Sequence, residues 1–109
     1  MSYYQQLIAG QCSWDGRLLV NVSSSRRTID KVLNGLLYKT GDELFENQIR
    51  EVSEFLNNFE RDMIAYHEHL LNESDMIDRY DHQTITDKFN LMGVITTDPR
   101  AEDVLYDPL

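Results

Sequence analysis

The stretch FENQIREVSEFLNNFERDMIAYHEHL, residues 45–70, decides the fold of this chain. It contains neither glycine nor proline, the two residues that most disfavour helix interiors. Its large apolar residues recur at alternating steps of four and three, the spacing that aligns them along one side of an α-helix. The sequence therefore predicts one long amphipathic helix over residues 43–72. Its apolar seam consists of Phe45, Ile49, Val52, Leu56, Phe59, Met63, Tyr66 and Leu70.

The residues just before this stretch predict where the long helix begins. Asp42 can accept hydrogen bonds from the free amides of the first turn, so it is the expected N-cap. Glu43 and Glu46 follow in that turn, where the helix dipole favours negative charge. We therefore expect the helix to start immediately after Asp42.

A second helix is predicted upstream, in SSSRRTIDKVLNGLLYKTG, residues 23–41. Its apolar residues repeat at three and four, Ser24 or Ser25 can cap its start, and Gly41 suits its end. Arg26 and Arg27 would then lie in the first turn, where the dipole disfavours cations. We expect an acidic partner for them, and the long helix can supply it. The apolar stripe consists of Ile29, Val32, Leu33, Leu36 and Leu37.

The first 23 residues favour extended structure. Asp15-Gly16 is a favoured two-residue hairpin turn, and it lies between residues 11–14 and the β-leaning run 18–22. Because two strands alone are marginally stable in water, we expect this β-hairpin to pack on the helices or on a neighbouring molecule.

The last third of the chain predicts shorter elements. Ser74 can cap a turn that contains Met76, and Thr84 or Thr86 can start a short helix that Gly93 ends. Residues 98–109, DPRAEDVLYDPL, are expected to form an extended tail. The predicted fold is mainly α, a helical hairpin or bundle around one long central helix. It is a single domain, residues 1–109, with an extended arm (1–23), a helical hairpin (24–73) and short helices with a tail (74–109).

Charge and composition limit the function and the compartment. The net charge is −9, with +3 over residues 1–41 and −12 over residues 42–109. Phosphate binding needs a basic face, so we expect no direct nucleic-acid binding. The absence of a long apolar run or a basic leader favours a cytoplasmic protein without membrane contact. Cys12 is the single cysteine, so no intrachain disulfide can form.

The length of the predicted central helix implies a partner. Thirty helical residues span about 45 Å, whereas a compact domain of this size has a radius of gyration of roughly 13 Å. Each large side chain of the seam left in water forfeits roughly 1.5 to 3 kcal/mol. We therefore expect the eight seam residues to bind another copy of the chain or another protein. The alternative is that residues 75–105 fold back and complete a monomeric bundle.

The histidines and carboxylates near the end of the long helix were considered as metal ligands. His69 and Glu73 are four residues apart and can share a helical face, while His67 and His82 lie nearby. The helical di-iron spacing, with a glutamate three residues before a histidine, is absent. A solvated, ion-paired face is the expected arrangement, with no metal and no cofactor.

Two acidic pairs carry a resemblance to a known enzyme family. Glu51-x-x-Glu54 is followed by Asp78-x-x-Asp81, a pattern similar to the paired motifs of the MazG-type all-α nucleoside triphosphate pyrophosphohydrolases. The resemblance implies magnesium held between helices by these four carboxylates.

The sequence as a whole favours a non-enzymatic protein–protein interaction module, of a structural, viral, adaptor or inhibitor type, without catalytic residues. It is expected to act through the helix seam and the C-terminal tail, as a homo-oligomer or with a partner protein. An acidic mimic of nucleic acid that inhibits a nucleic-acid-binding protein is the first alternative, and a MazG-like pyrophosphohydrolase is the second.

Overall fold

The computed structural model describes residues 16–36 and 41–105 of the chain. Within these ranges the regular structure is all helical and contains no strand, which confirms the mainly α fold. The helices are α2 (Gly16–Leu36), α3 (Glu43–His67), α4 (Glu73–Arg79), α5 (His82–Thr96) and α6 (Pro99–Leu105).

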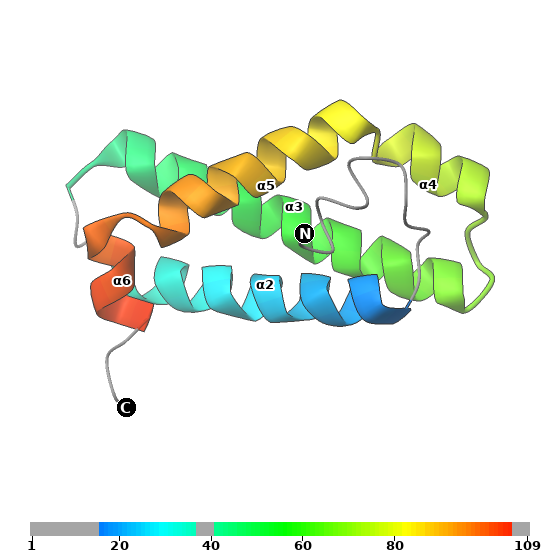
Figure 1. Ribbon diagram of the computed structural model, residues 1–109, viewed down its shortest axis with the longest axis horizontal. Helices are drawn as coiled ribbons and strands as arrows, with labels where there is room; N and C mark the ends of the chain where they lie inside the picture. The colour runs from blue at the N-terminus through cyan, green and yellow to red at the C-terminus, as the bar shows by residue number, and fades with distance from the viewer. Residues whose placement is uncertain (1–15, 37–40, 106–109) are drawn as a thin grey trace.

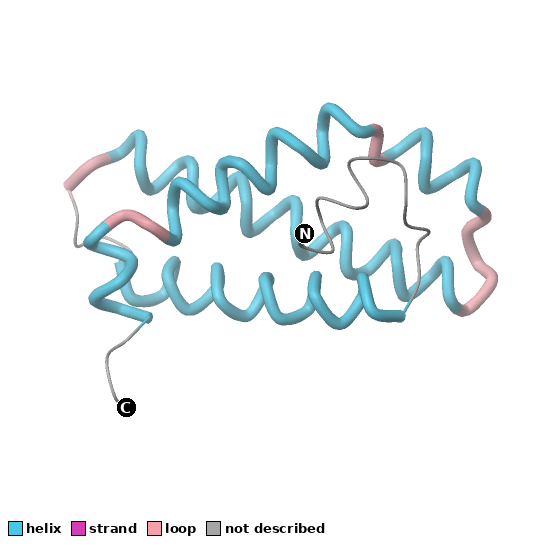
Figure 2. The backbone as a smooth tube through the Cα atoms, in the orientation of Figure 1, coloured by secondary structure: helices cyan, strands magenta, loops and turns pink. Residues whose placement is uncertain are grey.

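The helices form an elongated bundle of 41 × 26 × 25 Å around α3. In Figure 1, α2 and α3 run antiparallel, and α4 and α5 return along the other side of α3. The short α6 turns across the end of the bundle and packs against α2, as the tube in Figure 2 also shows. The chain thus surrounds its own central helix with its N-terminal and C-terminal elements.

The N-terminal hairpin prediction is wrong for its second strand. Residues 18–22 lie within α2, which begins at Gly16, while residues 11–15 lie outside the described residues. Val22 explains the difference, because it lies two helical turns before Ile29 and both side chains are fully buried. The longer helix also places Ser24 and Ser25 in its interior, so neither is the predicted N-cap.

The start of α3 is as predicted, and its end is not. Asp42 caps the helix by accepting a hydrogen bond from the Phe45 amide at 3.1 Å. The helix ends at His67, so it is shorter than the predicted range 43–72. His69 then adopts a left-handed conformation, with φ of 63°. This closes a Schellman turn, in which the Leu70 amide donates to the Ala65 carbonyl at 2.8 Å.

The helices α4 and α5 begin at other caps than those predicted. Asn72, not Ser74, caps α4, and its side chain and that of Asp75 bond each other's backbone amides in a capping box. Asp81 caps α5 by accepting from the Thr84 amide at 2.7 Å. Gly93 does not end α5, which continues to Thr96, because a single helical glycine costs only about 1 kcal/mol.

The predicted extended tail is helical over residues 99–105, while residues 106–109 lie outside the described residues. Asp98 accepts from the Arg100 amide at 2.9 Å, and Pro99 occupies the first helical position that proline favours. A Cβ added to Gly35 would lie 2.5 Å from a methyl group of Val104. A glycine of α2 therefore lets α6 approach closely.

Candidate functional site

Most of the predicted partner-binding seam lies inside the protein's own core. Six of the eight side chains are buried, and that of Tyr66 is partly buried against the core. The expectation that another molecule must cover Phe59 and Met63 is wrong, because the helices formed by residues 73–105 fold back over α3. Leu70 alone stays exposed, at 72%. The buried six are Phe45, Ile49, Val52, Leu56, Phe59 and Met63.

An aromatic cluster joins the C-terminal half of α3 to the returning helices. The rings of Phe59 and Tyr80 stack with centroids 4.6 Å apart. Phe55 packs edge-on against Tyr80 and against Phe89 of α5, each at 6.0 Å. Such pairs contribute about 0.5 to 1.5 kcal/mol beyond the area they bury. This cluster fixes the junction of α4 and α5 on α3.

A buried carboxylate anchors the same cluster. The side chain of Asp62 is 7% exposed. It accepts a hydrogen bond from the Tyr80 hydroxyl and forms an ion pair with Arg79 at 3.3 Å. Burial opposes ionisation, but the bonds from Tyr80 and Arg79, helped by Arg61, hold the pKa of Asp62 below its ordinary value. Burial and the bond to Asp62 raise the pKa of the Tyr80 phenol. The pair is therefore charged carboxylate and neutral phenol at neutral pH, a structural anchor.

Polar contacts also join α2 to α3. Arg26 lies 3.0 Å from Glu60 and 3.1 Å from Asp30, and the Ser53 hydroxyl donates to Asp30 at 2.9 Å. A hydrogen bond from Ser23 and the Arg26 ion pair outweigh burial and hold the pKa of Glu60 below its ordinary value. The predicted acidic partner of Arg26 on the long helix is thus present.

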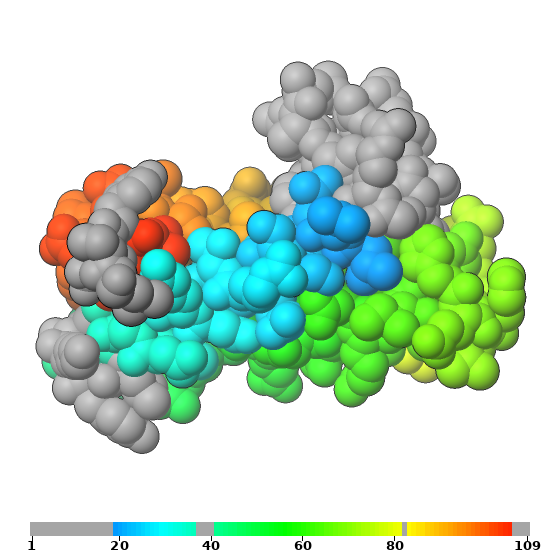
Figure 3. Space-filling view, turned by 90° about the horizontal axis from the view of Figure 1, so that it is seen from below, coloured from blue at the N-terminus to red at the C-terminus, as the bar shows by residue number. Residues whose placement is uncertain are grey.

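Exposed large apolar side chains lie near the end of α3, in the turn that follows it and on α4. Ile64, Leu70 and Ile77 are three of the six large apolar side chains that are exposed among the described residues. We call residues 64–78 the α3–α4 corner, which lies at the right-hand end of the molecule in Figures 1 and 3. Its exposed carboxylates are Glu68, Glu73 and Asp78.

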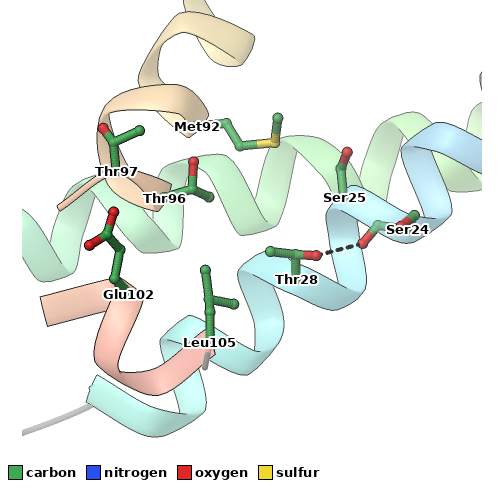
Figure 4. A pocket seen from close by; sticks show the side chains of 8 residues that line it. All are labelled: Ser24, Ser25, Thr28, Met92, Thr96, Thr97, Glu102 and Leu105. Carbon is green, nitrogen blue, oxygen red and sulfur yellow. Dashed lines mark hydrogen bonds between the residues drawn. The ribbon is translucent and has the colours of Figure 1, made fainter. Parts of the chain in front are cut away.

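A groove of about 440 Å³ lies between α2, α5 and α6, at a distance from this corner (Figure 4). Most of its lining side chains carry hydroxyl groups. The sequence did not indicate the groove, because α2 is far from α5 and α6 along the chain. The lining residues are Ser24, Ser25, Thr28, Met92, Thr96, Thr97, Glu102 and Leu105.

Two of the four carboxylates of the pyrophosphohydrolase resemblance have other contacts in the fold. Glu51 pairs with Lys88, and Asp81 caps α5. The predicted helical face shared by His69 and Glu73 is wrong, because His69 lies in the turn before α4. Among the described residues, no group of three histidine, cysteine or acidic side chains is placed to hold a metal ion.

Comparisons of the chain with protein-family models, with curated proteins and with solved structures found no match. No helix in the described part of the chain is both long and apolar enough to cross a membrane.

Proposed function

We propose that this chain is a non-enzymatic protein–protein interaction module whose contact surface is the α3–α4 corner. The observation that carries the proposal is the exposure of Leu70 and Ile77, at 72% and 53%, beside a seam that is otherwise buried. Exposed large apolar side chains that gather on one part of a surface favour a binding role. Residues 99–105, part of the tail that was expected to bind a partner, form α6, whose Ala101 is buried in the core.

The charges around the corner specify the chemistry of the partner. Glu68, Glu73 and Asp78 are exposed, whereas the nearby Arg79 already pairs with Asp62. A second copy would bring like charges together, since each chain carries −9. The surface fits another protein that presents an apolar patch with lysine or arginine at its rim, rather than a homo-oligomer.

The test is quantitative cross-linking of the tagged chain to proteins in its native cell extract, compared with a Leu70→Ser variant. Leu70 is exposed, so this substitution should change the free energy of unfolding by less than about 0.5 kcal/mol. A partner that is cross-linked by the parent chain and lost with Leu70→Ser supports the proposal, and the purified pair should then show weaker affinity.

Leu44→Ser is the matched control, because Leu44 is 70% exposed at the opposite end of α3. It should bind as the parent chain does. A partner that binds all three proteins equally would contradict a contact at the corner. If Leu70→Ser has no effect while moderate salt abolishes binding, the acidic mimic of nucleic acid becomes the better explanation.

A further inference from the structure

Three of the five hydroxyl groups that line the groove between α2, α5 and α6 already donate their hydrogen within the protein. The Thr28 hydroxyl donates to the Ser24 carbonyl at 3.1 Å, and the Thr97 hydroxyl donates to the Gly93 carbonyl at 2.8 Å. The Thr96 hydroxyl donates to that same carbonyl at 3.3 Å. Each hydroxyl has one hydrogen and two lone pairs, so these three oxygens have only acceptor capacity left for a ligand.

A carboxylate adds negative charge to this set of acceptors. Glu102 lines the groove from α6, and Figure 4 shows its carboxylate directed toward Thr97 at the end of α5. It forms no ion pair with any residue in the described part of the chain. Arg100, the basic residue nearest to Glu102 in the sequence, pairs instead with Asp98 at 3.0 Å. A ligand that brings donors and positive charge would satisfy the site.

The apolar part of the lining specifies the remainder of such a ligand. Met92 and Leu105 are partly buried side chains packed against the core, and both line the groove. The volume of about 440 Å³ suits a small molecule or a single long side chain. At the C-terminal end of α6, the Lys31 ammonium donates to the Leu105 carbonyl at 3.4 Å. The chain thus already places one alkylammonium group on an acceptor beside the groove.

We infer that this groove binds an aliphatic ammonium group, with the cation beside Glu102, Thr96 and Thr97 and the carbon chain against Met92 and Leu105. An ammonium carries three donors and no acceptor, which matches an acceptor-lined site. The ligand can be a free diamine or polyamine, or the lysine side chain of another protein. The groove is separate from the α3–α4 corner, so this inference does not depend on the proposed function.

The test is titration of the isotope-labelled chain with cadaverine, followed by amide chemical shifts. Cadaverine should shift the amides of Thr96, Thr97 and Glu102, whereas pentanol, which has the same carbon chain without charge, should not shift them to the same extent. Glu102→Gln should weaken cadaverine binding roughly tenfold, because it replaces a charge-assisted hydrogen bond to the carboxylate by a weaker one to a neutral amide. Nα-acetyl-lysine amide, whose one ammonium is that of the side chain, distinguishes the two ligands. Binding as tight as that of cadaverine indicates a lysine side chain, and much weaker binding indicates a free diamine.

Asp103→Asn is the matched control, since Asp103 is exposed on the same helix and does not line the groove. Its affinity for cadaverine should equal that of the parent chain. Thr97→Val is a second variant that keeps the side-chain shape and removes one acceptor, and it should also weaken binding. The inference is overturned if cadaverine shifts none of the groove amides, or if Asp103→Asn and Glu102→Gln weaken binding equally.

Discussion

The two halves of α3 bury the same apolar seam by different means. In the N-terminal half, the Arg100 guanidinium lies 3.9 Å over the Phe45 ring and Lys88 pairs with Glu51, so flexible surface side chains close the core. In the C-terminal half, Phe59 stacks on Tyr80, whose hydroxyl bonds the buried Asp62. Exposed ion pairs contribute little, whereas a buried polar anchor is costly to break. The second half should therefore tolerate substitution less well than the first.

Phe59→Ala should have the largest effect. The ring is fully buried and stacked, so its removal should lower the free energy of unfolding by about 3 to 5 kcal/mol. Phe45→Ala is the comparison, and it should cost less because the Arg100 side chain can collapse into the space. Chemical denaturation followed by circular dichroism measures both. Equal losses would show that the two halves are not held differently.

Tyr80→Phe should come next, with a loss of about 1 to 3 kcal/mol, because it leaves the buried carboxylate of Asp62 short of one donor. The folded pKa of Asp62 is lowered, so its charged form stabilises the fold above the ordinary carboxyl pKa. That stability is lost as the pH falls through the folded pKa. The difference in the free energy of unfolding between Tyr80→Phe and the parent chain should therefore become smaller at acid pH. A difference that is the same at neutral and acid pH would contradict the anchor.

Gly35→Ala tests how closely α6 approaches α2. The added Cβ would lie 2.5 Å from Val104, and such overpacking costs about 1 to 3 kcal/mol. Removing a helical glycine recovers about 1 kcal/mol, so the net loss should be at most about 2 kcal/mol. Gly93→Ala is the control, since nothing lies within 4 Å of its added Cβ. It should raise the melting temperature while Gly35→Ala lowers it, and a rise in both would contradict the close packing.

His69→Gly should have the smallest effect, and it should stabilise the protein. His69 holds a φ of 63°, a conformation that costs side-chain-bearing residues roughly 1 to 2 kcal/mol and glycine almost nothing. Glycine has more backbone entropy in the unfolded chain, which offsets part of this stabilisation. The free energy of unfolding should therefore rise by less than about 1 kcal/mol. Thermal unfolding measures it. His67→Gly, inside α3, should destabilise the protein instead. If His67→Gly also raised the melting temperature, the left-handed conformation of His69 could not be the cause of the stabilisation.

The features that the sequence predicted are those decided within a few residues. The heptad spacing correctly placed the apolar seam on one side of α3, and the Asp42 cap follows from local chemistry. The prediction that a partner covers the seam was wrong from Phe45 to Met63, because the chain's own helices bury it there. An acidic partner for Arg26 on the long helix was expected, and Glu60 is that residue. The expected reason was wrong, because Arg26 lies in the interior of α2 and not in its first turn.

The features that were missed depend on competition between local signals or on distant contacts. Asp15-Gly16 favoured a hairpin, although Val22 already lay two turns from Ile29 and indicated a longer helix. Asp98-Pro99 has the composition of a helix start, yet α6 also depends on distant packing, since Ala101 is buried in the core and Val104 lies against Gly35 of α2. The groove could not be predicted, because it forms where three helices converge.

The central claim is that one chain covers its own long helix and leaves the α3–α4 corner for a different protein. Sedimentation equilibrium over a roughly hundredfold concentration range, together with the melting temperature at each end of that range, tests it most directly. The account predicts a mass of 12.8 kDa throughout and a melting temperature that does not depend on concentration. A dimer or larger assembly whose melting temperature falls on dilution would contradict it.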